Sequence, residues 1–265
     1  MSVQQIQTNP GPVFKAEGLT HSFGSKCVLG DITFSVEQGE FMCIVGPSGI
    51  GKTTLLRSLS GLLIPSGGTL IFNGTPITEP PADLAVVFQD YSRSLMPWLN
   101  ILDNVTLPLR GQHCLSKKQR DERGMAALEE VNIAGSATKY PWQLSGGMQQ
   151  RAAIARALAY RPAAILMDEP FASVDAQTRA DLEDLVLSVR DHLGITVLLV
   201  THDIDEAVYL SDKVCVLSGS PAKVARVIDV DLGRERDQIT TKATSAFTEL
   251  RTEVFQMIRR PDALT

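Results

Sequence analysis

The residues best suited to chemistry are those of GPSGIGKTT, residues 46–54, which combine small glycines with one lysine. They fit G-x-x-x-x-G-K-[ST] directly after an apolar run and directly before leucines at helical spacing. Glycines let such a loop curl so that its N–H groups point inward, and the next helix adds its positive N-terminal end. Lys52 supplies a charge for β- and γ-phosphates, and Thr53 offers a hydroxyl to Mg²⁺. The stretch predicts a nucleoside triphosphate site.

Two adjacent carboxylates, Asp168 and Glu169, follow the apolar run AAILM at residues 163–167. Ligands of open α/β sheets bind at the carboxyl ends of strands, which is where these side chains would stand. Asp168 would hold Mg²⁺ through its waters, and Glu169 would polarise the water that attacks the γ-phosphate. Such carboxylates often only cap a helix, but behind a phosphate loop the pair predicts hydrolysis.

Two further polar residues end strand-like segments: Gln89 ends LAVVFQ, and His202 ends ITVLLVTH. From spacing alone, each fits an ordinary loop residue as well as it fits a catalytic one. The other histidines, at 21, 113 and 192, have no such placement and are interpreted as surface or packing residues.

A second glycine pair stands in LSGGMQQ, residues 144–150, and has no lysine beside it. Ser145 offers a hydroxyl, Gly146 and Gly147 expose backbone N–H groups, and a helix begins there with its dipole directed at an anion. Because this turn lacks the lysine of a complete phosphate site, we expect it to close a nucleotide site that it does not form by itself.

Strands alternating with helices must position these residues, which predicts an α/β fold with a mainly parallel sheet. Strands are expected at 13–19, 27–40, 40–46, 68–74, 84–89, 163–170, 195–202 and 213–219, and helices at 47–63, 176–194 and 203–211. Residues 92–160 are mainly helical and form an insertion. The tail at 245–260 predicts an amphipathic helix with one apolar face made of Phe247, Leu250, Val254, Phe255 and Ile258.

Composition sets outer limits on these interpretations. The chain has 265 residues, 44% of them hydrophobic, and a formal net charge of −5, which argues against broad binding to nucleic acid. Its four cysteines show no metal spacing and are interpreted as free buried thiols in a reducing compartment. The first residues lack the features of a signal peptide, and the longest apolar runs are strand-sized. We therefore expect a soluble cytoplasmic protein that meets a membrane only through a partner.

GPSGIGKTT, Gln89, LSGGMQQR, ILMDEP, SVDAQTR and VTHD occur in the order and spacing of the nucleotide-binding subunit of ABC transporters. The chain resembles that family over about residues 13–230, and LSGG between a P-loop and its acidic strand is highly specific. The resemblance implies a P-loop ATPase cassette with an N-terminal antiparallel β subdomain and an inserted helical subdomain. It also implies a head-to-tail homodimer in which each ATP lies between one P-loop and the partner's signature.

The resemblance carries roles to individual positions. The nucleotide-binding residues would be Phe23, Gly46, Pro47, Ser48, Gly49, Ile50, Gly51, Lys52, Thr53 and Thr54. The signature that reaches the partner's ATP would be Leu144, Ser145, Gly146, Gly147 and Gln149, with Asp175 in the loop that senses the other site. Catalysis would use Glu169, with His202 as the γ-phosphate switch and Gln89 as a link to Mg²⁺, which Thr53 and Asp168 also hold.

Two positions depart from the family pattern. Phe23 stands where the family often has a tyrosine that stacks on adenine, and phenylalanine can still stack without the hydroxyl. The loop FASVD replaces the commoner FGALD, which leaves the aspartate in place and changes only local packing. By resemblance, residues 1–265 are one ABC ATPase domain: a core at 1–91 and 161–230, a helical subdomain at 92–160 and a tail at 231–265.

The segment LMPW…ILDNV, after Gln89, is similar to importer ATPases for nitrate, aliphatic sulfonates and taurine. Importers of pyrimidine thiamine precursors share these features, so the solute stays open. Trp98 fits packing inside the helical subdomain nearly as well as contact with a membrane subunit. The resemblance implies two transmembrane permease subunits, indirectly a solute-binding protein, and a peripheral position on the cytoplasmic face of the membrane.

Two rival functions compete with an importer motor. A small-molecule kinase would need an acceptor pocket and usually an arginine-rich lid, whereas the helical block here carries LSGG. A soluble ATPase of the same class, acting in repair or translation, typically has a coiled-coil insertion or two cassettes. Neither pattern occurs in this sequence.

Overall fold

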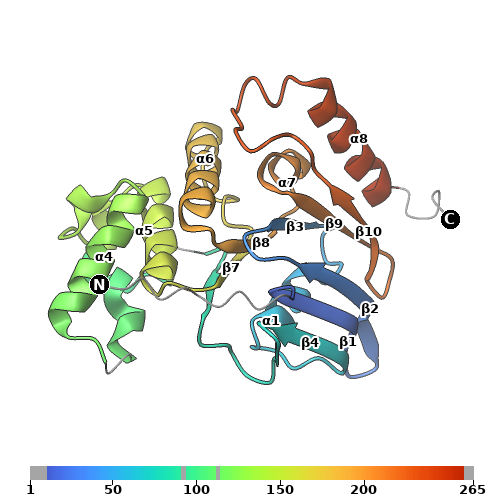
Figure 1. The fold of residues 1–265 in the computed structure, drawn as a ribbon, viewed down its shortest axis with the longest axis horizontal. Helices are drawn as coiled ribbons and strands as arrows, with labels where there is room; N and C mark the ends of the chain where they lie inside the picture. Colours follow the sequence, from blue (N-terminus) through green and yellow to red (C-terminus); the bar gives the residue numbers. More distant parts are fainter. Residues whose placement is uncertain (1–10, 91–93, 112–113, 260–265) are drawn as a thin grey trace.

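Two β-sheets and a block of helices make up the molecule (Figure 1). The computed structural model describes residues 11–90, 94–111 and 114–259. His113, residues 92 and 93 of the predicted helical insertion and Arg260 at the end of the predicted tail helix lie outside these ranges. The helical block lies at one side of the molecule in Figure 1, and the two sheets lie together on the other. The chain therefore has the predicted α/β architecture.

The first sheet is antiparallel and has the strand order β2-β1-β4-β5. Its strands are β1 (Phe14–Phe23), β2 (Lys26–Val36), β4 (Gly67–Phe72) and β5 (Thr75–Pro76). A two-residue connection, Gly24-Ser25, joins β1 to β2 and pairs Phe23 with Lys26 across the hairpin. Gly24 has φ +59°, which suits the tight turn of such a hairpin. This sheet matches the expected N-terminal antiparallel subdomain.

The second sheet has the order β10-β9-β3-β8-β7-β6 and is parallel except for β10. Its strands are β3 (Phe41–Val45), β6 (Leu84–Val87), β7 (Ala164–Asp168), β8 (Thr196–Val200), β9 (Lys213–Ser218) and β10 (Lys223–Asp229). Every residue of β3, β7 and β8 is buried, because layers cover both faces of the sheet. The antiparallel strand β10 was not anticipated.

The described helices divide between the block and the sheet faces. They are α1 (Lys52–Leu59), α3 (Ile101–Thr106), α4 (Lys117–Glu130), α5 (Gly146–Ala159), α6 (Ala176–Leu193), α7 (Ile204–Leu210) and α8 (Ser245–Arg259). Short 3-10 turns span Leu107–Gly111, Ala134–Ser136 and Pro141–Gln143. The helix expected to reach residue 63 ends at Leu59, because Gly61 takes φ +71° and Leu62 is exposed.

Two hydrophobic cores lie on opposite faces of the parallel sheet, and β3 shows why. Phe41, Cys43 and Val45 pack into the core shared with the helical block and α6 to α8. Met42 and Ile44, at the alternating positions, pack into the core shared with α1 and the antiparallel sheet. Side chains alternate across a strand, so one short strand joins both cores. The loop after β3 is thereby held from both sides.

Several expectations about exposure need correction. In α8, Phe247 and Val254 are buried as expected, but Met257 fills the apolar face while Phe255 is 46% exposed. Cys43 and Cys215 are buried, whereas Cys27 and Cys114 are exposed, so the thiols are not uniformly buried. Trp98 is 71% exposed, which contradicts the alternative that it packs inside the helical subdomain.

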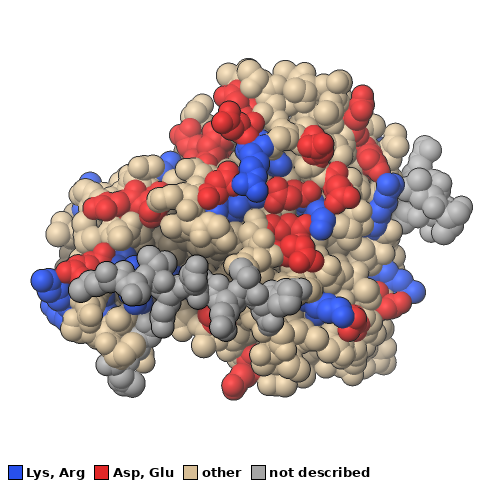
Figure 2. Space-filling view, in the orientation of Figure 1, with Lys and Arg blue, Asp and Glu red and all other residues tan. Residues whose placement is uncertain are grey.

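The surface agrees with an acidic chain. In the face seen in Figure 2, acidic side chains gather over the part of the molecule that carries α6, α7 and α8, with lysine and arginine interspersed. Among the described helices, none is both long and apolar enough to cross a lipid bilayer.

Candidate functional site

The strand order of the parallel sheet brings the predicted site residues together. Strands β3, β8, β7 and β6 are consecutive neighbours and all run in one direction, so their carboxyl ends share one edge. Residues 46–54 follow β3, His202 follows β8, Asp168 and Glu169 stand at the end of β7, and Gln89 follows β6. Loops at this edge are the usual ligand-binding position in open α/β sheets.

The loop at 46–54 is shaped by glycines and held by its lysine. Gly49 and Gly51 have φ values of +75° and +121°, which side chains with a Cβ rarely adopt. Lys52 is buried, and its Nζ donates to the carbonyl oxygens of Gly46 at 2.9 Å and Pro47 at 3.2 Å. Burial lowers the pKa of Lys52, whereas Glu169 and Asp168 act in the opposite direction. The Lys52 ammonium is thus held by the carbonyls at the start of the loop, and Lys52 is itself the first residue of α1.

The two carboxylates at the end of β7 differ in environment. Asp168 is 9% exposed, and its pKa is raised first by burial and then by the charge of Glu169, against the opposing effects of Arg57 and Lys52. Glu169 adopts φ +42°, in the left-handed region, while its N–H donates to the Val200 carbonyl at 2.8 Å. A non-glycine residue in this conformation is strained, and such strain is concentrated at functional sites.

Three of the predicted residues meet at one carboxylate oxygen. Oε2 of Glu169 lies 3.3 Å from Nε2 of Gln89 and 3.1 Å from Nδ1 of His202. The side chain of Glu169 is 21% exposed and that of His202 is 61% exposed, so the group can be reached from solvent. The arrangement holds a carboxylate beside a phosphate loop, where it could orient or deprotonate water.

The turn that contains Ser145 divides into exposed and packed residues. Ser145 caps α5: its Oγ accepts a hydrogen bond from the N–H of Met148 at 3.4 Å, and both Ser145 and Gly146 are exposed. Leu144 and Gly147 are buried. Gln149 donates its amide to the carbonyls of Pro141 and Leu144 at 3.0 and 3.2 Å, which braces the preceding turn. Within this turn, only two of the predicted signature residues are thus presented to solvent.

Asp175 serves as the N-cap of α6. Its two carboxylate oxygens accept the backbone N–H of Thr178 at 3.0 Å and the Thr178 hydroxyl at 2.7 Å. These hydrogen bonds lower the pKa of Asp175. The next helix, α7, is capped by Asp203, which also pairs with Arg179 of α6 at 3.2 Å. The starts of α6 and α7 are therefore tied together beside His202.

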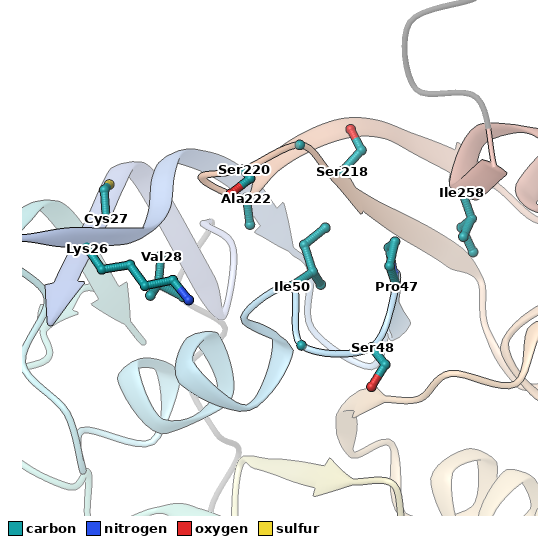
Figure 3. A pocket seen from close by; sticks show the side chains of 12 residues that line it. Lys26, Cys27, Val28, Pro47, Ser48, Ile50, Ser218, Ser220, Ala222 and Ile258 are labelled. Atoms are coloured by element: carbon teal, nitrogen blue, oxygen red, sulfur yellow. The ribbon is translucent and has the colours of Figure 1, made fainter.

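A cavity of about 260 Å³ lies against the outer side of the phosphate loop (Figure 3). Pro47, Ser48, Gly49 and Ile50 form one wall, and the start of β2, the turn after β9 and Ile258 of α8 form the others. Figure 3 shows the Lys26 amine directed toward the loop. Phe23, the cross-strand partner of Lys26, is 53% exposed. Its ring contacts the His21 ring edge-on, with 4.6 Å between the two ring centroids.

Sequence reasoning did not identify Lys26 as a site residue. The available signal was the Gly24-Ser25 hairpin, since a two-residue connection pairs the residues on either side of it. His21, interpreted as a surface or packing residue, is buried, and His192 pairs at the surface with Glu130 at 3.0 Å.

The donors near the loop suit a hard cation. Thr53 offers a hydroxyl, Asp168 a carboxylate and Gln89 a carbonyl oxygen, because its amide nitrogen is the atom turned to Glu169. Oxygen ligands of this kind fit Mg²⁺, which usually keeps waters and binds together with substrate phosphates. Within the described ranges, no cluster of three or more His, Cys, Asp or Glu side chains could hold a metal ion, so a cation here would share its ligands with a nucleotide.

Comparisons with known proteins agree with this geometry. The family model described as ABC transporter matches residues 29–172. The nitrate transport protein NasD of Klebsiella oxytoca is 37% identical over 254 residues, which cover 93% of this chain and 96% of that protein. The bicarbonate transport ATP-binding protein CmpD of Synechocystis sp. is 39% identical over 231 residues, covering 86% and 81%.

A solved structure extends the likeness to three dimensions. It is described as the dimeric post-hydrolysis state of an ATP-binding cassette bound to ADP and Pi. Its TM-score is 0.71 at 31% sequence identity, covering 82% of this chain and 98% of that one.

Proposed function

This chain belongs to the ABC transporter family, as an ATP-hydrolysing cassette, and on that premise we propose that it is the motor subunit of an importer for a small anion. One observation carries the catalytic part of the proposal: Glu169 meets both Gln89 and His202 at the edge of the sheet that also carries the phosphate loop. Nitrate and bicarbonate, named for two relatives, are both small planar oxyanions, which is the class of solute we propose.

The proposed hydrolysis assigns one task to each group. Adenine stacks on Phe23, and the phosphates lie in the loop at 46–54. Lys52 exchanges its two carbonyl acceptors for the β- and γ-phosphates. Glu169 accepts a proton from the attacking water, while Gln89 and His202 fix the position of its Oε2. Mg²⁺, held by Thr53, Asp168 and Gln89, would neutralise developing charge on the phosphates.

We propose that two copies share each ATP. Ser145 and Gly146 present a hydroxyl, an N–H group and a helix N-terminus to solvent, which together suit an anion. Among the described residues, no hydrogen bond or ion pair joins residues 144–147 to residues 46–54. The signature of one copy would therefore complete the nucleotide site of its partner, as expected from the sequence, and Asp175 would lie in the loop between the two sites.

Glu169→Gln tests this assignment, because the amide keeps the shape of the side chain but cannot accept the proton. We expect ATP turnover to fall by about 100-fold or more, ATP to stay bound, and a dimer to appear on size-exclusion chromatography only with ATP. A variant that stays monomeric at saturating ATP would contradict the shared site. Lys52→Ala in the same background is the matched control and should abolish the ATP-dependent dimer by weakening nucleotide binding.

The proposed partners are two transmembrane permease subunits at the cytoplasmic face of the membrane and, through them, a solute-binding protein. Exposed aromatics of the helical block support a docking surface there: Trp98 and Trp142 are each 71% exposed. The N–H groups of Ile101 and Leu102 donate to the carbonyls of Lys139 and Ala137, so the segments that carry the two indoles meet.

The solute is tested through the partners, since this chain need not contact it. The full chain is co-purified with its permease from membranes, and the associated binding protein is titrated by calorimetry with nitrate, bicarbonate, taurine, an aliphatic sulfonate and an uncharged pyrimidine. Binding of nitrate or bicarbonate is the expected result, and selective binding of taurine or the sulfonate would contradict the planar oxyanion class. Selective binding of an uncharged pyrimidine would overturn the anion class and leave the ATPase assignment intact.

A further inference from the structure

Two helix starts touch at Gly147 and Thr178. A Cβ atom built on Gly147 would lie 2.3 Å from Cγ2 of Thr178, far inside van der Waals contact. Gly147 is the second residue of α5, is buried, and does not have the positive φ that demands glycine elsewhere. The absence of a side chain at this position therefore makes room for the start of α6.

Thr178 cannot easily move away from Gly147. Its backbone N–H and its hydroxyl occupy both carboxylate oxygens of Asp175, at 3.0 and 2.7 Å. Threonine is stiff about χ1, so turning its methyl group away from Gly147 would also remove the hydroxyl from Asp175. One side chain thus contacts the signature turn with its methyl group and the Asp175 loop with its hydroxyl.

We propose that Thr178 is a positioning residue that couples the signature turn to the Asp175 loop within one subunit. This inference rests on the proposed function, in which Ser145 binds the partner's ATP and Asp175 lies between the two sites. A displacement of α5 on ATP binding would press on the Thr178 methyl and shift its hydroxyl on Asp175. The ordinary explanation for a glycine at position 147 is that a phosphate approaches the backbone closely. That explanation assigns no role to Thr178.

The test moves one methyl group from α6 to α5. Gly147→Ala adds a methyl that overlaps Thr178, and Thr178→Ser removes the overlapped methyl but keeps the hydroxyl. We expect Gly147→Ala to lower the melting temperature and to reduce the ATP-dependent dimer of the Glu169→Gln chain at least tenfold. Adding Thr178→Ser should recover at least half of the loss that Gly147→Ala causes in each readout, measured against Thr178→Ser alone. Gly135→Ala, where nothing lies within 4 Å of an added Cβ, is the matched control.

The rescue has a clear contrary result. If Gly147→Ala is harmless, or if Thr178→Ser fails to rescue it, the methyl contact is not the reason for the glycine and the inference is wrong. The melting temperatures need neither ATP nor a partner. If the Glu169→Gln chain itself forms no dimer with ATP, that result counts against the proposed function. The melting temperatures would still test the contact between Gly147 and Thr178.

Thr178→Val separates positioning from packing. Valine keeps the methyl against Gly147 but removes the hydroxyl from Asp175. We expect kcat for ATP to fall at least threefold, with KM changed less than twofold and the melting temperature close to that of the parent chain. An unchanged kcat would overturn the coupling and leave only a packing contact.

Discussion

At the scale of single residues, Glu169 shows how the site is held. Its φ of +42° costs conformational energy, and its N–H bond to Val200 ties it to the neighbouring strand β8. Strand β7 lies between β6 and β8, and the Glu169 side chain contacts Gln89, which follows β6, and His202, which follows β8. Backbone and side chain are therefore fixed from two neighbouring strands, which is the precision that water activation requires.

Phe23 gives the first prediction at this scale. Stacking of a base on an aromatic ring contributes about 1–3 kcal/mol, so Phe23→Ala should weaken ATP binding about 5- to 150-fold. Phe23→Trp should retain binding, because the indole offers a larger stacking face. The measurement is titration of the purified chain with ATP by calorimetry.

Trp98→Ala is the control for Phe23. It removes an aromatic side chain that is still more exposed than Phe23, at 71% against 53%, but that belongs to the helical block rather than to the β1–β2 hairpin. ATP affinity should stay at the wild-type value. Wild-type affinity in Phe23→Ala as well would show that adenine stacks elsewhere.

At the scale of elements, the site is built from helix starts. Ser145, Asp175 and Asp203 cap α5, α6 and α7, and each is followed by the helix that it anchors. Arg179 joins α6 to Asp203, and a chain of hydrogen bonds runs behind His202 from the N–H of Asp203 to Thr201 and from the Thr201 hydroxyl to Glu206. The loop that carries His202 is thus held by a buried carboxyl group on α7.

Burial raises the pKa of Glu206 to about 8, with Glu183 and Asp203 adding to the rise and the hydrogen bond from Thr201 and the charge of Arg179 opposing it. Between the ordinary value of 4.5 and about 8, the folded chain holds a proton that the unfolded chain has lost. The free energy of unfolding should therefore fall as pH rises through this window, by several kcal/mol in order of magnitude.

Glu206→Gln mimics the protonated group and should flatten this dependence, so that the variant is relatively more stable on the alkaline side. Urea unfolding across the window measures the effect. Glu79→Gln, at an exposed carboxylate, is the control and should keep the wild-type slope. Equal slopes for Glu206→Gln and the wild type would mean that Glu206 is ionised in the fold.

At the scale of the whole molecule, the phosphate loop and the signature turn belong to different parts of the fold. The loop follows β3 inside the parallel sheet, whereas Ser145 begins a helix of the helical block (Figure 1). If a nucleotide needs both the phosphate loop and the signature turn, a single copy carries one half of each of two different sites. Symmetric dimerisation would then create two complete sites from four halves.

Mixing two inactive variants tests this arrangement. Lys52→Ala removes the ammonium that binds the phosphates, and Ser145→Arg blocks the signature turn. Each variant alone should therefore lose ATPase activity. An equal mixture should recover activity, up to about a quarter of the wild-type rate, because half of the dimers contain one intact site. The measurement is phosphate release after mixing in the absence of ATP and then adding it.

The control mixture is Lys52→Ala with the double variant Lys52→Ala/Ser145→Arg, which can form no intact site and should stay inactive. Full activity of Ser145→Arg by itself would contradict the composite site directly.

Much of the fold and of the site could be predicted because its signals are local. The apolar runs before Gly46 and before Asp168 are strand-sized and continuous, and they became central strands covered on both faces. Predictions that depended on long-range packing failed more often. Phe255 and Met257 both fit an amphipathic helix, and only the docking of α8 on the core decides which one is buried.

By itself, the sequence determined the phosphate loop, the acidic strand end, the signature turn and the alternation of strands with helices, because glycine conformation, charge and hydrophobic period act over a few residues. Only the tertiary structure decided that Lys26 faces the phosphate loop, that Gln89 and His202 share one oxygen of Glu169, and that a side chain at Gly147 would meet Thr178. These contacts join residues distant in the chain, and which atoms meet is fixed by the packing of sheets and helices rather than by any local pattern.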